Sequence, residues 1–309
     1  MVKNFTLVDP YDNELYTYLW EPQDVNPIGV VQILHGAGEH VGRYEHFAKF
    51  LNSLGLIVIG NDHLGHGRTS TNLDYVYFAD TKGFYKLNDG VLTVRDYIGE
   101  YYPKLPVILF GHSMGSFLGR YTIMYHHKLY DQAIFTGTAV FNGLKLSLAT
   151  QFAGLVKVLR GKKYVSKILT SMTNDAAFKS MKKNGLINER IEWITADKAI
   201  QKEFLESEYC GMPFTVGAQH DLYKFIPQIQ DTKKIKKCAS STAIFFINGE
   251  LDALGGYGDD AKKLFNIYHN NGYSNVKYAV VNNARHEIIN EIGKEHTYKM
   301  IGDFILRYI

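Results

Sequence analysis

Short runs of aliphatic and β-branched residues alternate with longer helical patterns over most of this chain, and this alternation restricts the fold more than any other feature. Between residues 28 and 138 the runs are "IGVVQIL", "LIVIGND", "VILF" and "AIFTGT". The alternation returns after Thr242 with "TAIFFI" and "NVKYAVV", and a last helical pattern extends from His286 to Ile309. Strands that alternate with helices form βαβ units, which build a parallel sheet with helices on both faces.

Two further runs, "NFTLVDP" and "ELYTYLWEP", precede this region on either side of the turn-forming residues "YDN". Such a pattern indicates an antiparallel hairpin at the edge of the sheet. The sequence therefore predicts an α/β fold with an eight-stranded, mostly parallel sheet.

The segment between Thr138 and Thr242 is too long for a single connection. It contains about a hundred residues, whereas a crossover between parallel strands requires roughly a dozen. Its pattern is helical, with apolar and lysine-rich turns and no reliable strand alternation. We therefore predict a core formed by residues 1–138 and 228–309, with a helical cap inserted at residues 139–227.

Charge and cysteine content exclude several classes of protein. The 309 residues carry a formal net charge of +3, which does not favour binding to nucleic acid. Cys210 and Cys238 are too few for a disulfide framework or a zinc site. The first residues, "MVKNFTLVDPYDN", lack the apolar core of a signal peptide, and no apolar run reaches the ~18 residues of a membrane span. We expect a cytoplasmic protein.

A single serine stands between two glycines in "VILFGHSMGSFLGRY", where a buried strand pattern ends and a helix is predicted from Ser116. The pattern GxSxG is informative in this strand-turn-helix context, because the sharp turn places the serine hydroxyl at the end of the sheet. Gly111 and Gly115 would leave room for the neighbouring chain. We therefore predict that Ser113 is a nucleophile, against the alternative of a turn that only requires glycine.

A serine hydroxyl needs a base near neutral pH, and an imidazole oriented by a carboxylate is the usual solution. In this architecture the acid follows a later strand and the histidine follows the last one. Asp252 in "NGELDALGGYG" and His286 in "NNARHEIINE" have these positions. Glu250 and Asp259 are alternative acids, of which Glu250 lies closer to the strand and Asp259 resembles a helix N-cap.

Acyl transfer also needs hydrogen-bond donors for the developing oxyanion. The loop after the first parallel strand, "ILHGAGEHVGRYEHF", and the start of the helix after the serine can supply backbone amides, and we predict those of Ala37 and Met114. His63 and His66 near Asp62 in "NDHLGHGRTS" could suggest a metal site, but no further ligands with suitable spacing follow. We expect no metal and no cofactor.

Five motifs, "HGAGEHVGRYEHFAKFL", "DHLGHGRTS", "LFGHSMGS", "NGELDALGGYG" and "ARHEIINE", together resemble the monoacylglycerol lipase and lysophospholipase branch of the α/β-hydrolase family. The resemblance covers residues 28–140 and 240–309. It implies the same roles for the five residues assigned above, and it implies that Glu39 and Arg43 form a structural pair that braces the oxyanion loop. The cap segment "WITADKAIQKEFLESEYCGMPFT" looks like bacterial members described as lysophospholipases and esterases, and it departs from the animal lipases.

The sequence thus predicts a serine hydrolase that cleaves small-molecule carboxylic esters through an acyl-enzyme, with single-chain lipid esters as the preferred class. An aminopeptidase with the same triad is one alternative, in which Glu203, Glu206 and Glu208 of the cap would hold the free amine of the substrate. A ligand-binding protein without turnover is another. The segment "LATQFAGLVKVLRGKKYVSKILTSM" could contact a membrane, although a cap helix that lines its own tunnel is favoured. The oligomeric state stays open.

Overall fold

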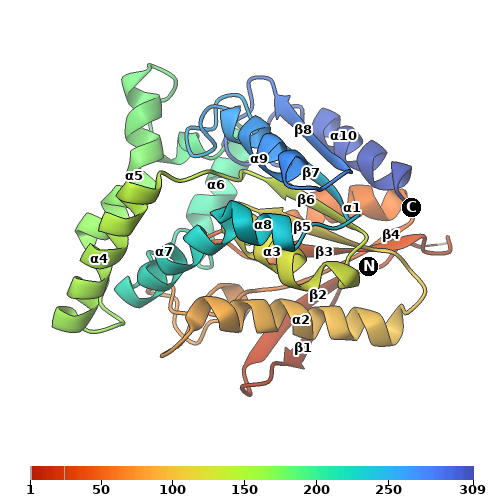
Figure 1. Cartoon of the computed structure of the whole chain (residues 1–309), viewed down its shortest axis with the longest axis horizontal. Helices are drawn as coiled ribbons and strands as arrows, with labels where there is room; N and C mark the ends of the chain where they lie inside the picture. Colours follow the sequence, from red (N-terminus) through yellow and green to blue (C-terminus); the bar gives the residue numbers. More distant parts are fainter. Residues whose placement is uncertain (1, 24) are drawn as a thin grey trace.

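The computed structural model describes residues 2–23 and 25–309, apart from the side chains of residues 172–174. Its described strands form one eight-stranded sheet with the order β1-β2-β4-β3-β5-β6-β7-β8 (Figure 1). The strands are β1 (Val2–Val8), β2 (Glu14–Trp20), β3 (Gly29–Leu34), β4 (Leu56–Asn61), β5 (Val107–His112), β6 (Gln132–Thr136), β7 (Ala243–Gly249) and β8 (Val276–Val281). The β1-β2 hairpin is antiparallel and joins β4 in antiparallel orientation, and the remaining pairs are parallel. The predicted α/β fold with its mostly parallel sheet is confirmed.

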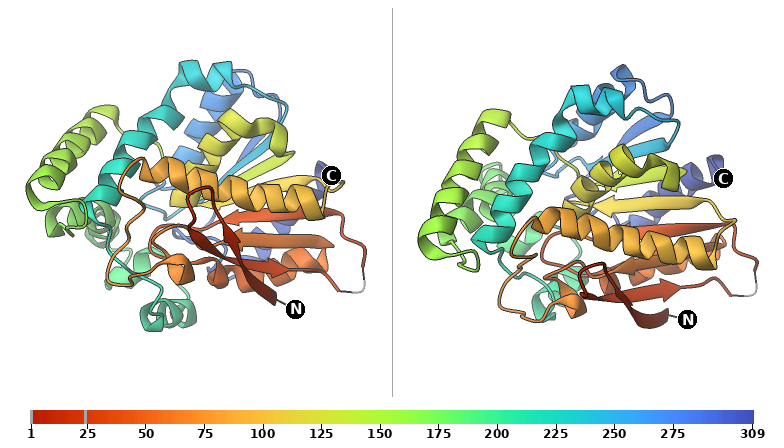
Figure 2. Two further views of the ribbon diagram at one scale, coloured as in Figure 1. Left: turned by 90° about the horizontal axis from the view of Figure 1, so that it is seen from below. Right: turned by 60° about the horizontal axis from the view of Figure 1, so that its bottom comes forward.

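Helices cover both faces of the sheet, because strands β3 to β7 are buried along their whole length and need apolar partners on each side. On one face α1 (Glu45–Ser53) and α10 (Lys294–Arg307) contribute buried residues to a core with the sheet. On the other face α2 (Gly83–Tyr101), α3 (Met114–His126), α8 (Thr232–Lys237) and α9 (Asp259–Asn270) form a second core. Both layers are visible in Figure 2.

The long connection between β6 and β7 holds five of the described α-helices and a short 3-10 segment. Besides α8, these are α4 (Gly143–Arg160), α5 (Lys167–Lys183), η4 (Arg190–Trp193), α6 (Lys198–Glu206) and α7 (Val216–Gln230). Helix α4 packs on α7, which in turn packs on α2 and α3. Figure 1 shows α4 and α5 to the left of the sheet. The division of the chain at residues 138 and 227 stays a prediction, and α7 continues through the second of these positions.

Two predicted helix starts are wrong. The last helix begins at Lys294 and not at His286, while α3 begins at Met114, two residues before the predicted start. Residues 286–293 form an irregular loop because their polar groups bond outside a helical ladder. The Glu291 carboxylate accepts hydrogen bonds from three backbone amides, which holds this loop in turns. Gly293, in the left-handed region with φ 76°, then precedes the helix.

Candidate active site

Ser113 occupies a strained turn between β5 and α3. Its φ of 51° and ψ of −118° are unusual for a residue with a side chain. A Cβ atom on Gly115 would lie 2.1 Å from the Leu34 carbonyl oxygen, and one on Gly111 would lie 2.6 Å from the Gly115 carbonyl oxygen. Both glycines are therefore required by the close approach of backbone. The turn leaves Ser113 8% exposed at the carboxyl edge of the sheet.

His286 and Asp252 are joined by a hydrogen bond of 3.0 Å between imidazole Nδ1 and carboxylate Oδ2. Asp252 is fully buried in the loop after β7, and its Oδ1 accepts the Leu254 amide at 3.0 Å. Burial alone would raise the pKa of the Asp252 carboxyl, but the His286 imidazole and backbone amides lower it below its usual value. The carboxylate thus stays charged and holds Nδ1 as the protonated nitrogen, which leaves Nε2 free to accept a proton.

The two alternative acids lie elsewhere. Glu250 is exposed and accepts the Asn283 amide at 2.8 Å. Asp259 is also exposed and is the first residue of α9, where Gly258 and not Asp259 is the N-cap. Of the three carboxylates weighed from the sequence, the structure brings Asp252 against His286.

The side chain of His286 lies beside that of His112, the residue that precedes Ser113. The imidazole rings of His112 and His286 have centroids 4.8 Å apart, and a Cβ on Gly137 would lie 2.8 Å from both rings. Among the described residues, however, none forms a hydrogen bond with the Ser113 hydroxyl. The structure therefore joins Asp252 to His286 and places His112, the neighbour of Ser113, beside that pair.

The two predicted oxyanion donors flank the serine. Gly36 approaches so closely that its Cβ would lie 3.3 Å from that of Ser113, and Ala37 follows as an exposed residue. Met114 is the first residue of α3, whose N-terminus carries a partial positive charge. Within the described part of the chain, neither the Ala37 nor the Met114 amide donates a hydrogen bond. Both are available to a negatively charged oxygen.

A buried ion cluster connects the loop of Ala37 to the loop of His286. Arg43 donates to Glu39 and makes two hydrogen bonds to Glu287, of 2.8 and 2.7 Å. Glu39 also accepts the Gly36 amide at 2.6 Å. The sequence resemblance found the pair of Glu39 and Arg43 but not Glu287. An acidic residue directly after the base was the only available signal, and it does not reveal a partner 244 residues away.

These charges affect the pKa of His286. Burial lowers the pKa of the His286 imidazole, but Asp252, Glu287 and Glu39 raise it by more, so that it lies above its usual 6.5. For Glu287 burial opposes ionisation, yet the Arg43 guanidinium lowers its pKa to about 2. For Glu39 burial outweighs the same guanidinium and raises the pKa. Glu287 is therefore the more firmly ionised of the two carboxylates that share Arg43.

The histidines near Asp62 form a buried structural group. His35 accepts the His63 amide at Nε2, at 2.8 Å, and its ring lies 4.2 Å from that of His63. Burial lowers the pKa of His63 to about 3 and that of His66 to about 4, so both are neutral near pH 7. In the described part of the chain, no group of three or more His, Cys, Asp or Glu side chains could hold a metal ion.

The cap contacts the loops that surround Ser113. The Gly211 amide donates to the Gly38 carbonyl at 2.8 Å, the ring of Phe204 lies over the Arg43 guanidinium, and the Trp193 ring packs on His286.

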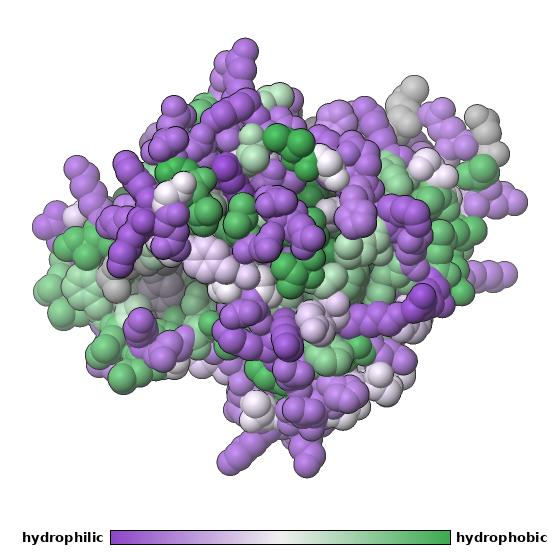
Figure 3. Space-filling view, turned by 90° about the horizontal axis from the view of Figure 1, so that it is seen from above, coloured by the Kyte–Doolittle hydropathy of each residue, from purple (hydrophilic) through white to green (hydrophobic). Residues whose placement is uncertain are grey.

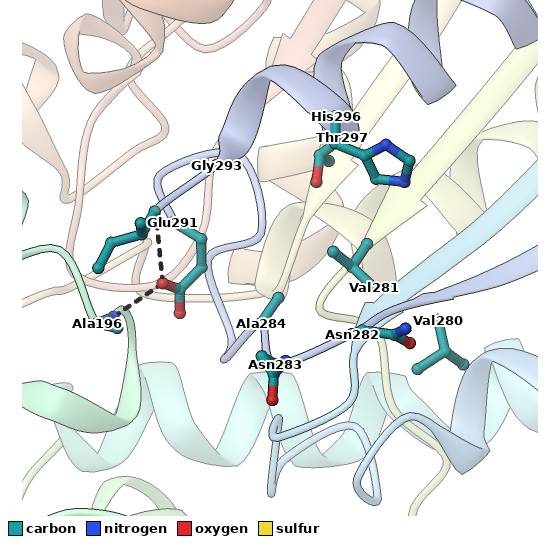
Figure 4. A pocket seen from close by; sticks show the side chains of 11 residues that line it. Ala196, Val280, Val281, Asn282, Asn283, Ala284, Glu291, Gly293, His296 and Thr297 are labelled. Carbon is teal, nitrogen blue, oxygen red and sulfur yellow. Dashed lines mark hydrogen bonds between the residues drawn. The ribbon is translucent and has the colours of Figure 1, made fainter.

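Two cavities of the protein are lined by residues away from Ser113. One of about 500 Å³ is lined by Ala196, residues 280–284 and the start of α10 (Figure 4). The other, of about 620 Å³, lies between residues 77–80 and 157–164.

Comparisons with known proteins identify the family of this chain. A family model described as "Serine aminopeptidase, S33" (Hydrolase_4) matches residues 25–293. The human protein "Monoglyceride lipase" is 38% identical over 109 residues, which cover 35% of this chain and 34% of that protein. Its mouse counterpart is 32% identical over 167 residues, or 54% and 51% of the two chains. The "Monoacylglycerol lipase" of Mycolicibacterium smegmatis is 39% identical over 97 residues, or 31% and 32%. The matched part thus spans a third to a half of these curated relatives.

Solved structures with the same fold cover the whole chain. A thermostable carboxyl esterase from Bacillus coagulans has a TM-score of 0.86 at 23% identity, with 99% of this chain and 98% of that chain covered. A monoglyceride lipase from Saccharomyces cerevisiae, in complex with a substrate analogue, has a TM-score of 0.74 at 15% identity, with 100% and 94% covered. At these identities the likeness shows the fold alone.

We predict that His286 controls the reactivity of Ser113 as pH changes. A fluorophosphonate should label Ser113 only when the imidazole is neutral, so the labelling rate should fall as pH drops through a midpoint above 6.5. Asp252→Asn should move this midpoint to lower pH, because the substitution removes the main group that raises the imidazole pKa. It should also slow labelling by roughly ten-thousand-fold. The measurement is the labelling rate as a function of pH.

Glu250→Gln is the matched control and should leave both the rate and the midpoint unchanged. If instead Glu250→Gln abolishes labelling while Asp252→Asn reacts normally, the acid is assigned to the wrong residue.

Proposed function

The chain belongs to the family described as serine aminopeptidase, S33, within the α/β-hydrolases, and from this premise we propose that it is a serine hydrolase of carboxylic esters. The observation that carries the proposal is the hydrogen bond between His286 and the buried, ionised Asp252 beside the strained Ser113. Single-chain lipid esters of the monoacylglycerol or lysophospholipid type are the proposed substrate class. We place the enzyme in the cytoplasm as part of the same proposal.

The proposed mechanism has two steps. Ser113 Oγ attacks the ester carbonyl carbon while His286 Nε2 takes the hydroxyl proton, and the Ala37 and Met114 amides bind the oxyanion that forms. When the tetrahedral intermediate collapses, the bond to the alcohol breaks, and the alcohol leaves with the proton from His286. Water then attacks the acyl-enzyme with the same base, which releases the fatty acid and restores Ser113. Asp252 keeps the imidazole in the required tautomer throughout.

The interior of the cap supports an apolar acyl chain as part of the substrate. Leu146 and Ala153 of α4 and Leu169 of α5 are buried. Phe141, at the start of the cap, has its ring 5.5 Å from that of Phe117 on α3. These side chains continue the core from the helix behind Ser113 into the cap. The monoglyceride lipases among the relatives are consistent with such a substrate.

Aminopeptidase activity is the second candidate, since the matching family is described by it. A peptidase of this kind needs acidic groups that converge on the amine of its substrate. Glu203, Glu206 and Glu208, the candidates from the sequence, are all exposed on or just after α6. Glu206 lies near Lys202, at 3.8 Å, on the same helix surface. This arrangement favours a solvated surface and therefore the ester substrate. Non-catalytic proteins of this fold usually lack a residue of the triad, whereas Ser113, Asp252 and His286 are all present here.

We predict that Ser113→Ala abolishes ester hydrolysis and fluorophosphonate labelling. In a comparable triad, loss of the nucleophile lowers turnover by roughly a million-fold. Ser116→Ala removes the nearest hydroxyl on α3, which donates to the Ser113 carbonyl oxygen at 2.6 Å, and should retain activity and labelling. Turnover rates and labelling in a gel measure both. A Ser113→Ala protein with a tenth of the normal activity would falsify the assignment, and a wild-type protein that is never labelled would favour the non-catalytic alternative.

We predict that the specificity constant rises with acyl chain length. Each methylene that enters the apolar cap should contribute about 0.8 kcal/mol, close to a four-fold gain, until the chain extends beyond the apolar lining. A series of 4-nitrophenyl esters or monoacylglycerols should therefore show increasing kcat/KM from two carbons to about eight or more. Triacylglycerols should be poor substrates because the cap closes the site. Acetyl esters as the best substrates would contradict the lipid class, and faster hydrolysis of alanine or proline anilides would establish the peptidase.

We also propose that the cap contacts an anionic membrane. None of the described helices is long and apolar enough to cross a bilayer. However, Leu144, Leu148, Leu155, Val158 and Leu159 on α4 are between 57% and 80% exposed. Figure 3 shows apolar side chains gathered at the left of the molecule, where Figure 1 places α4 and α5. An exposed apolar face of this kind on a helix is typical of an interaction surface.

The basic residues around this apolar face favour an anionic lipid surface as its partner. Residues 143–172 contain six lysine or arginine residues and no aspartate or glutamate, although the whole chain has a net charge of only +3. Lys157, Arg160, Lys162 and Lys163 line the cavity of about 620 Å³ at the end of α4. Basic residues at the rim of an apolar surface fit an anionic lipid surface, to which each contributes about 1 kcal/mol.

We predict that the protein binds vesicles containing phosphatidylglycerol and binds pure phosphatidylcholine vesicles more weakly. Replacing Lys162 and Lys163 together by Glu should lower the affinity for anionic vesicles at least roughly ten-fold. Lys299→Glu on α10, an exposed lysine outside the cap, should leave it unchanged. Flotation and hydrolysis of a water-soluble ester give independent readouts. Equal binding of both vesicle types would contradict the electrostatic part of the proposal, and no binding would contradict all of it.

A further inference from the structure

The loop that carries His286 is bonded to one segment of the cap, residues 186–196. The Arg285 guanidinium donates to the carbonyl oxygens of Glu192 at 2.7 Å and Thr195 at 3.1 Å. The Glu287 amide donates to the Ile194 carbonyl at 2.7 Å. The residues on both sides of His286 therefore hold the same short stretch of the cap.

Glu291 completes this connection. Its carboxylate accepts the amide of Ala196 in the cap at 3.0 Å and the amide of Arg285 at 2.9 Å. Figure 4 shows the bond to Ala196 beside the cavity behind the His286 loop. The Thr195 hydroxyl adds a bond of 2.8 Å to the Asn290 carbonyl. We name these contacts between residues 186–196 and 285–291 the cap clasp.

The cap clasp places an aromatic ring on the imidazole of His286. Trp193 ends η4, and its ring centroid lies 4.7 Å from that of His286 with the planes inclined by 30°. A second ring, that of His112 at the end of β5, lies 4.8 Å from His286. With Asp252 at Nδ1, the imidazole is held by one hydrogen bond and two neighbouring rings. Trp193 is the one of these three neighbours that the cap supplies.

We propose that Trp193 is a positioning residue for the catalytic base and that the cap clasp holds it in that role. A single hydrogen bond fixes Nδ1 but leaves the ring plane free to swing about it. The indole restricts this motion and so keeps Nε2 directed toward Ser113. Small errors in such alignment reduce the rate of the chemical step and not the affinity for substrate. The inference rests on the proposed function, in which His286 is the base.

The charged groups around the imidazole come from other elements. Asp252 lies in the loop after β7, and Glu287 directly follows His286. Glu39 lies in the loop after β3, and Arg43 lies in the short 3-10 segment that follows this loop. His112 is the last residue of β5. Beside Trp193, a hydrogen bond from Lys198 and the backbone amides lowers the pKa of Glu192 to about 2, so this group does not titrate near neutral pH. Trp193 is therefore expected to sense the protonation of His286.

Kinetics test the positioning role. Trp193→Ala should lower kcat for a water-soluble ester by roughly ten- to a hundred-fold, while KM changes less than about three-fold. Trp193→Phe, which retains a ring, should recover most of the rate. Arg285→Met removes side-chain bonds of the cap clasp and should lower kcat in the wild-type background but have little further effect in Trp193→Ala. The proposal would be overturned if the losses in kcat from Trp193→Ala and Arg285→Met were additive in the double variant. A Trp193→Ala effect confined to KM would also overturn it.

Fluorescence provides a readout that does not depend on turnover. The chain has two tryptophans, so Trp20→Phe leaves Trp193 as the single indole. A protonated imidazole in contact quenches indole emission, so emission should fall as pH is lowered through the His286 pKa, above 6.5. His286→Gln should abolish this titration. Trp193→Phe in the wild-type background, which leaves only Trp20, is the matched control and should not titrate.

The two experiments separate failure of the inference from failure of the proposed function. An inactive protein whose Trp193 emission still titrates with His286 retains the contact, and the proposed ester hydrolysis then fails alone. An active enzyme without the titration, or with normal kcat after Trp193→Ala, contradicts the role of Trp193. Should Trp193→Ala not fold, Trp193→Leu and the fluorescence titration decide the question.

Discussion

The buried guanidinium of Arg43 holds together the two loops on which the proposed chemistry depends. Its side chain is 10% exposed and lies between Glu39, in the loop of Ala37, and Glu287, which follows His286. Burying charge costs several kcal/mol per ion, and this cost is offset only where the remaining oxygens are also bonded. Glu39 accepts the Gly36 amide and Glu287 accepts the Asn290 side chain, so the condition is met. Removing either carboxylate would leave a buried, partly unpaired charge, and both loops would respond together.

The sheet supplies the second constraint, because it brings the ends of strands distant in sequence to one edge. The loops after β3, β5, β7 and β8 carry the proposed amide donor, nucleophile, acid and base in that order. The strained backbone of Ser113 costs on the order of 1–3 kcal/mol and persists because its surroundings determine it. Its amide donates to Thr136 on β6 at 2.9 Å, and Gly115 allows close contact with the end of β3. Neighbouring strands thus fix the turn from both sides.

The sequence allowed the sheet, the turn at Ser113 and the positions of Asp252 and His286 to be predicted, because each depends on local patterns at strand ends. Glu287 and Trp193 could not be found in this way. Their partners, Arg43 and His286, lie far away along the chain, and no local pattern encodes such pairs. The start of the last helix was missed for the same reason. The carboxylate of Glu291 binds amides of the loop and of the cap, and these tertiary bonds override the helical pattern after His286.

The cap has two distinct faces. One face contacts the loops around Ser113 and His286, and the other is exposed to solvent. Gly211 contacts the loop of Ala37, and Phe204 contacts Arg43. The cap clasp holds Trp193 against His286. The outer helices connect to the same elements, since α5 packs on η4 and Asp175 pairs with Arg190. The two cap proposals place the lipid surface on α4 and the contact with His286 on η4, so both lie within the same insertion between β6 and β7. A bilayer would alter turnover only through a differential affinity for two arrangements of the cap. Substrate access and alignment of His286 would then depend on the same segment.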